Sequence, residues 1–76
     1  MLTIPHEVVG LQLKLGLSLI AAWRKYKKMS QTTLGEKLGI SQSAIAQIEN
    51  SDTQPTRKTL EKLAKALNID IEQLID

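Results

Sequence analysis

The chain has 76 residues, a formal net charge of +2 and no cysteine, so we expect one small domain without disulfides or thiolate metal sites. Its single histidine, His6, cannot form a metal cluster or a catalytic relay alone, and neither a nucleophile with a histidine beside it nor a Gly-rich phosphate loop is present, so we expect neither an enzyme nor a bound metal or cofactor. No signal-peptide pattern occurs, and Gln12, Lys14 and Ser18 interrupt the leucine-rich segment, which argues against a membrane span and for a cytoplasmic protein.

The N-terminal segment "GLQLKLGLSLI" (residues 10–20) supports two interpretations. Leucine at every second position is typical of a half-buried strand. The competing pattern is a set of apolar residues spaced by four, three and four, as on one face of a helix: Ile4, Val8, Leu11 and Leu15. A strand would have to include Gly16 and run into residues that begin the next helix. We therefore predict a helix over residues 5–15 that ends at Gly16.

Two further leucines, Leu13 and Leu17, do not fit the narrow apolar stripe of this helix. Apolar side chains that the domain leaves uncovered indicate a second contact, with a twin subunit or another protein. The sequence thus predicts a partner surface at Leu13 and Leu17. It lies in an N-terminal helix and connection (residues 1–17) that precedes the main domain (residues 18–76).

From residue 18 onward the chain has the pattern of short capped helices. The hydroxyl residues suited to helix starts are Ser18, Ser30, Ser41 and Thr56. Gly39 and Asn68 suit left-handed helix ends, and Asp70 with Gln73 forms a capping box for a last short turn. No strand is required in this part of the chain, so the predicted fold is all-α.

Only residues 39–41 separate the second and third of these main-domain helices, which forces a steep crossing, as in a helix-turn-helix unit. The segments "MSQTTLGEKLGISQSAIAQIEN" (residues 29–50) and "PTRKTLEKLAKALNIDIEQLI" (residues 55–75) resemble the phage-repressor or Xre-type helix-turn-helix family. The resemblance implies a compact five-helix bundle, here with an additional N-terminal helix. It also implies a DNA-binding transcriptional regulator that inserts the helix over residues 42–49 into the major groove.

The outward face of this recognition helix carries short neutral side chains in place of lysine and glutamate. We predict that the following residues contact base edges: Gln42, Ser43, Ala44, Ala46 and Gln47. Glutamine presents a donor and an acceptor together, which suits the N6 and N7 edge of adenine, and an alanine can meet a thymine methyl group.

A second set of residues is expected to contact phosphates. The resemblance places Gln31 near phosphate and next to Gln42, which it can brace, and the backbone N–H groups at helix starts attract anions. The predicted phosphate contacts are Gln31, Thr32, Asn50, Lys27, Lys28, Arg57 and Lys58. The resemblance further implies an ion pair between Arg24 and Glu49 that fixes the recognition helix. Gly35 departs from the family, which usually has alanine there.

The leading hypothesis is a repressor that binds a palindromic operator as a homodimer, because one such module reads only a few base pairs. The alternative is an antitoxin that binds a toxin protein and autoregulates its operon. This alternative depends on a looser likeness between the N-terminal part of the chain and the region that leads into the helix-turn-helix domain of some antitoxins.

Overall fold

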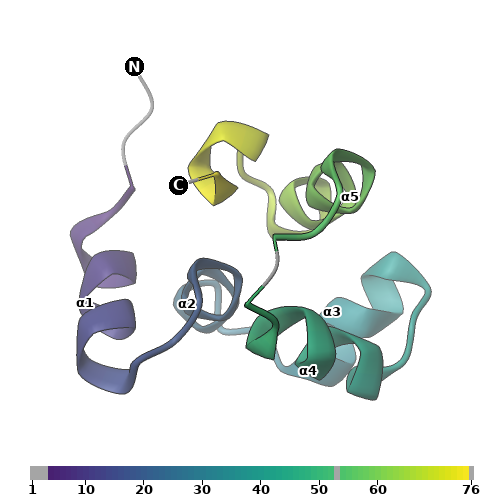
Figure 1. The fold of residues 1–76 in the computed structure, drawn as a ribbon, viewed down its shortest axis with the longest axis horizontal. Coiled ribbons are helices and arrows are strands. Elements are labelled where there is room, and N and C mark those ends of the chain that lie inside the picture. Colours follow the sequence, from purple (N-terminus) through teal and green to yellow (C-terminus); the bar gives the residue numbers. More distant parts are fainter. Residues whose placement is uncertain (1–3, 53, 76) are drawn as a thin grey trace.

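The computed structural model describes residues 4–52 and 54–75, so the predicted domain limits at residues 1 and 76 lie outside the described residues. The described part of the chain is all-helical, as predicted (Figure 1). Its elements are α1 (His6–Leu15), α2 (Leu19–Tyr26), α3 (Gln31–Leu38), α4 (Gln42–Asn50), α5 (Arg57–Leu67) and the 3-10 helix η1 (Ile71–Leu74). Helices α2 to α5 with η1 form the predicted five-helix bundle, and α1 is the additional N-terminal helix. None of the described helices is long and apolar enough to cross a membrane.

The predicted caps explain where the helices of the bundle begin and end. The side chains of Ser18, Ser30, Ser41 and Thr56 each accept a hydrogen bond from the backbone N–H three residues later, at 3.0–3.3 Å. Left-handed residues end α3 and α5, with φ of 74° at Gly39 and 58° at Asn68. The capping box of Asp70 and Gln73 is also present. These ends therefore follow from local residue chemistry.

Helix α1 confirms the helical interpretation of the leucine-rich segment. It begins at His6, one residue later than predicted, because Pro5 takes the N-cap position. Val8 is fully buried, and Ile4 and Leu11 pack half-buried against the same core cluster. This core consists mainly of residues from α2 and α5, together with Leu34 and Ile45. Its largest fully buried side chains are those of Trp23, Leu34, Ile45, Leu63, Leu67 and Val8.

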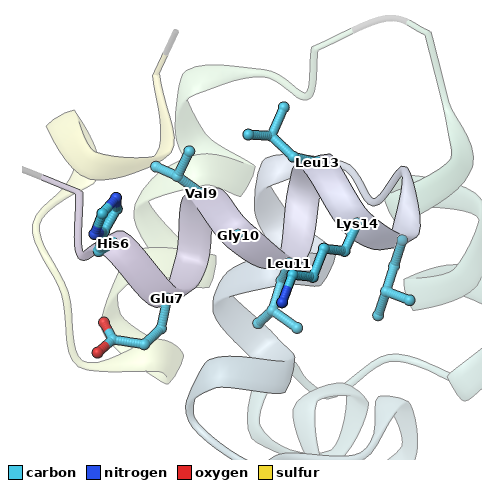
Figure 2. Close-up of a pocket in the computed structure, with 8 residues that line it drawn as sticks. His6, Glu7, Val9, Gly10, Leu11, Leu13 and Lys14 are labelled. Atoms are coloured by element: carbon cyan, nitrogen blue, oxygen red, sulfur yellow. The ribbon is translucent and has the colours of Figure 1, made fainter.

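Two predictions about the leucines at the end of α1 were wrong. Leu15, predicted to face the domain, is 59% exposed, whereas Leu17, predicted as partner surface, packs half-buried against the core. The reason is that α1 ends at Leu15 and Gly16 adopts a left-handed conformation with φ of 64°. The chain turns there, so Leu17 returns to the domain. Leu13 remains at the surface, 80% exposed, on the side of α1 that Figure 2 shows.

Gly35 lies where α3 approaches the turn that leads to α4. A Cβ atom at this position would lie 2.7 Å from the Ile40 carbonyl oxygen and 3.3 Å from that of Ser41. Both atoms belong to the backbone, so the turn itself would have to move. In this chain the turn is therefore closer to α3 than the family's usual alanine would allow.

We expect Gly35→Ala to destabilise the protein by about 1–2 kcal/mol, because the overpacking cost exceeds the gain of about 1 kcal/mol in helix propensity. Urea denaturation followed by circular dichroism measures the change. The control is Lys37→Ala, an exposed change in the same helix with an expected effect within about 0.5 kcal/mol. Equal or greater stability of Gly35→Ala would contradict the close approach.

Candidate nucleic-acid interface

Helix α4 presents one face to the core and the opposite face to solvent. Ile45 and Glu49 are buried on the inner side. On the outer side lie the five predicted base-contacting residues, of which Gln42, Ser43 and Gln47 are exposed and Ala44 and Ala46 half-buried. The outer face carries no charged side chain among these five, so it is a neutral surface with hydrogen-bonding groups.

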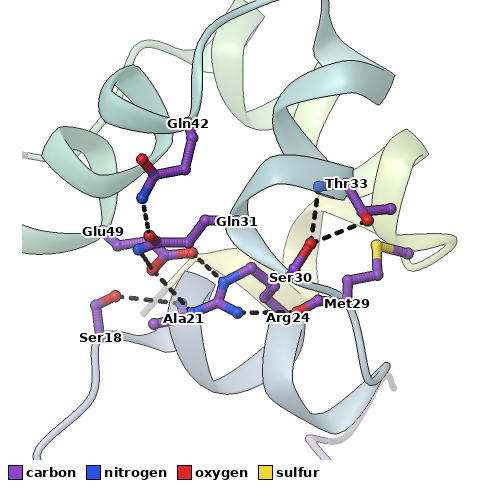
Figure 3. A network of polar contacts seen from close by, with 9 residues as sticks. All are labelled: Ser18, Ala21, Arg24, Met29, Ser30, Gln31, Thr33, Gln42 and Glu49. Atoms are coloured by element: carbon purple, nitrogen blue, oxygen red, sulfur yellow. Dashed lines mark hydrogen bonds and ion pairs between the residues drawn. The ribbon is translucent and has the colours of Figure 1, made fainter.

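A buried ion pair joins α4 to α2, as the resemblance to the family implies (Figure 3). The Nε atom of Arg24 lies 2.6 Å from Oε2 of Glu49, and Nη2 lies 3.2 Å from Oε1. The remaining nitrogen, Nη1, donates to the backbone carbonyl of Met29 at 2.8 Å. Only 8% of Arg24 and 6% of Glu49 is exposed. One arginine thus fixes the last turn of α4 and the connection that leads into α3.

The network continues from the ion pair to the first residue of α4. Gln31 donates from Nε2 to Oε1 of Glu49 at 3.0 Å, and Gln42 donates from Nε2 to Oε1 of Gln31 (Figure 3). A carboxylate only accepts hydrogen bonds, so Gln31 must direct its amide nitrogen to Glu49 and its oxygen to Gln42. Gln42 must then direct its amide nitrogen to Gln31. Its own oxygen and its second N–H are left available for another molecule.

One predicted phosphate contact, Gln31, belongs to this network, and a second, Asn50, lies beside it. Gln31 and Asn50 line one polar pocket, which Ser18, Arg24 and Glu49 also line. Thr32 is exposed in the first turn of α3. The start of α3 and the end of α4 therefore form one surface.

The start of α5 lies on the other side of α4. Ala44 and Gln47 line a groove with Thr56 and Thr59, and Arg57 and Lys58 follow Thr56 as exposed residues. Neither Arg57 nor Lys58 lines this groove, and the guanidinium of Arg57 lies 4.0 Å from the carboxylate of Glu61 in the same helix.

Lys27 and Lys28, the two basic residues that follow α2, differ in their surroundings from Arg57 and Lys58. Lys27 is half-buried, and its Nζ atom lies 6.0 Å from the centre of the Trp23 ring, within cation–π range. Lys28 is exposed in a left-handed conformation with φ of 59°. The contact with Trp23 gives Lys27 a structural role in addition to its predicted role as a phosphate contact.

Sequence reasoning missed two residues that border the site. Ser18 and Thr56 were predicted only as helix caps, but Ser18 lines the pocket of Gln31, and Thr56 lines the groove of Gln47. The signal was present in the sequence, since a capping residue marks a helix N-terminus, where backbone N–H groups attract anions.

Comparisons with known proteins identify the family of this chain. The helix-turn-helix family model matches residues 20–74. The ImmF control region 10 kDa protein of Bacillus phage phi105 is 39% identical over 61 residues, which cover 80% of this chain and 67% of that protein. The immunity repressor protein of the same phage is 39% identical over 56 residues, which cover 74% of this chain and 39% of the repressor.

A third relative is repressor protein C2 of Salmonella phage P22, 41% identical over 56 residues, which cover 74% of this chain and 26% of C2. The chain therefore spans about two thirds of the first relative and well under half of the other two. No solved structure matches it significantly. Since the family model covers most of the chain, the chain belongs to the helix-turn-helix family of phage-repressor or Xre-type transcriptional regulators, which bind DNA.

Proposed function

We propose that this chain is a sequence-specific DNA-binding repressor that inserts α4 into the major groove of an operator and blocks a promoter. One observation carries the proposal, namely the network of hydrogen bonds that runs from Arg24 through Glu49 and Gln31 to Gln42. It gives the amide of Gln42 a fixed orientation before any DNA is bound. A preorganised side chain loses less conformational freedom on binding, which favours its use as a specific contact.

The orientation of Gln42 supports the reading of adenine. Its oxygen is available to accept from N6, and its second N–H is available to donate to N7. Gln47 supplies a similar amide on the same exposed face, and Ser43 a hydroxyl group. The half-buried Ala44 and Ala46 offer methyl groups for a thymine methyl.

The flanking elements support phosphate contacts on both sides of α4. Gln31 and Asn50 line one pocket beside α4, Thr32 is exposed next to Gln31, and Arg57 and Lys58 are exposed at the start of α5. Lys27 and Lys28 add positive charge at the end of α2. Contacts of this kind fix the position of a protein on the duplex without reading its sequence.

The proposed form on DNA is a homodimer on a palindromic operator, because one recognition helix reads too few base pairs for a specific site. The proposed role is that of a regulator, not of an enzyme. The names of the relatives compared above include repressors and give the antitoxin alternative no support.

The test is a titration of DNA selected from a random pool, beside a scrambled duplex, at two salt concentrations. We expect Gln42→Ala to weaken binding to the selected DNA by about 10- to 100-fold and to leave the scrambled duplex unaffected, because a bidentate contact discriminates by about 1–3 kcal/mol. Gln47→Ala should act in the same way at another base position.

The matched control is Lys58→Ala. Loss of a phosphate contact should weaken binding to both duplexes alike and reduce the slope of log affinity against log salt by about one unit. Full discrimination in both glutamine variants would reject Gln42 and Gln47 as base-reading residues. Equal affinity of the unaltered chain for all duplexes would reject sequence-specific binding itself.

A further inference from the structure

The outer face of α1 is an open apolar groove that the domain does not cover. Val9, Gly10 and Leu13 line it, and Leu13 is 80% exposed. A Cβ atom at Gly10 would meet nothing within 4 Å. This helix therefore has room for another helix to approach its backbone.

The charged residues of this face are arranged along one edge. Figure 2 shows Val9 and Leu13 on one edge of α1, Glu7 and Lys14 on the opposite edge, and Gly10 between them. Glu7 and Lys14 are seven residues apart, which is two helical turns, so they lie on the same side of the helix. The acidic group is near the start of α1 and the basic group near its end.

We propose that this face binds the same face of a second copy of the chain, with the two α1 helices antiparallel about a two-fold axis near Gly10. A two-fold interface requires a surface that is complementary to itself. In an antiparallel pair like edges meet, so Glu7 of each copy lies opposite Lys14 of the other. In a parallel pair related by a two-fold axis, the charged edge of each copy would instead lie opposite the apolar edge of the other.

The apolar residues fit the same arrangement. With the axis near Gly10, Leu13 of one copy lies between His6 and Val9 of the other. The two glycines face each other at the crossing, where the absence of side chains permits close contact of the backbones. The proposal thus accounts for the exposure of Leu13, the glycine within a helix and the order of the charges.

This inference rests on the proposed function, because it names the surface that would join two DNA-reading subunits. Helix α1 lies at one end of the longest axis, which is 29 Å, and α3 and α4 lie toward the other end (Figure 1). Pairing through α1 leaves both α4 helices uncovered.

The interface is expected to be weak without DNA. A helix of ten residues is about 15 Å long and buries less than the roughly 800 Å² per partner of a standard interface. We expect a monomer–dimer equilibrium in the micromolar range, measured by sedimentation equilibrium from about 1 to 500 μM.

The first test is a charge exchange. Glu7→Lys and Lys14→Glu should each raise the dissociation constant of the dimer about tenfold, since each places like charges together, and the double variant should restore it. Glu61→Lys, an exposed change on α5, is the control and should leave the equilibrium unaltered. Circular dichroism checks that α1 remains helical, because both reversals oppose the helix dipole.

The second test uses Gly10. Gly10→Leu favours the helix, and the Cβ atom that it adds meets nothing within 4 Å in the subunit, but it should abolish the dimer by separating the helices. The chain has no cysteine, so Gly10→Cys should form an intersubunit disulfide on mild oxidation, while Lys62→Cys on α5 should not. A chain that stays monomeric throughout, or a dimer that Gly10→Leu leaves unchanged, would overturn the proposal.

These assays contain no DNA, so they separate the two proposals. If Gly10→Leu is dimeric but Gln42→Ala loses discrimination, only the interface is wrong. If the dimer behaves as expected and the glutamine variants read DNA normally, only the assignment of the base-reading residues is wrong.

Discussion

Glu49→Ala is expected to lower the free energy of unfolding by about 3–5 kcal/mol, because it leaves the buried guanidinium of Arg24 without its counter-charge. Arg24 is 8% exposed, so water cannot replace the lost carboxylate in full. This loss is a large part of the roughly 5–15 kcal/mol that stabilises a typical domain. Urea denaturation followed by circular dichroism measures it.

Two controls distinguish charge burial from general damage. Glu61→Ala removes one partner of an exposed pair, in which Arg57 lies 4.0 Å away, and should cost under about 1 kcal/mol. The double variant Arg24→Met/Glu49→Leu removes both buried charges and should recover most of the stability. It should still discriminate poorly between DNA sequences, because Gln31 has lost the carboxylate that orients it. Equal costs for Glu49→Ala and Glu61→Ala would show that the buried pair has no special role.

Trp23→Ala should cost a similar amount, about 3–5 kcal/mol, because it empties the centre of the core. The indole is 2% exposed, and its Nε1 donates to the backbone carbonyl of Gln73 at 2.9 Å. It also makes an edge-to-face contact with Tyr26 at 5.7 Å between ring centres. One side chain thus joins α2 to η1, which is 50 residues away in sequence. Thermal unfolding followed by circular dichroism reports the loss.

Trp23→Phe separates the two contributions of this residue. It retains most of the apolar contact but removes the donor to Gln73, so we expect a loss of about 1–3 kcal/mol. If phenylalanine and alanine were equally destabilising, packing would contribute little and the predicted order would be refuted.

The sequence predicts the helices well because their ends depend on neighbouring residues. A hydroxyl group three residues before the N–H that it caps, or a glycine at a left-handed end, acts within one turn. The exposure of Leu15 and Leu17 could not be predicted in this way. It depends on where α1 leaves the surface of the domain, which is a property of the packed bundle and not of the spacing of the leucines.

The sequence predicts which residues form the candidate site better than it predicts how their side chains are oriented. The resemblance to a family identified Arg24, Glu49, Gln31 and Gln42, and the structure brings these four residues together. The direction of each amide depends on the carboxylate at the end of the chain of hydrogen bonds, 18 residues from Gln31. No local pattern contains that information.

The hydrogen-bond network also divides the residues of α4 into those that must be retained and those that can be redesigned. It holds Gln42, whereas the side chains of Ser43, Ala46 and Gln47 form no hydrogen bond with other described residues. Ser43 and Gln47 are also exposed, so substitutions at these two positions can change the preferred operator with little effect on stability. A library randomised at Ser43 and Gln47, with Arg24, Gln31 and Glu49 retained, is therefore a practical starting point for new DNA specificities on this scaffold.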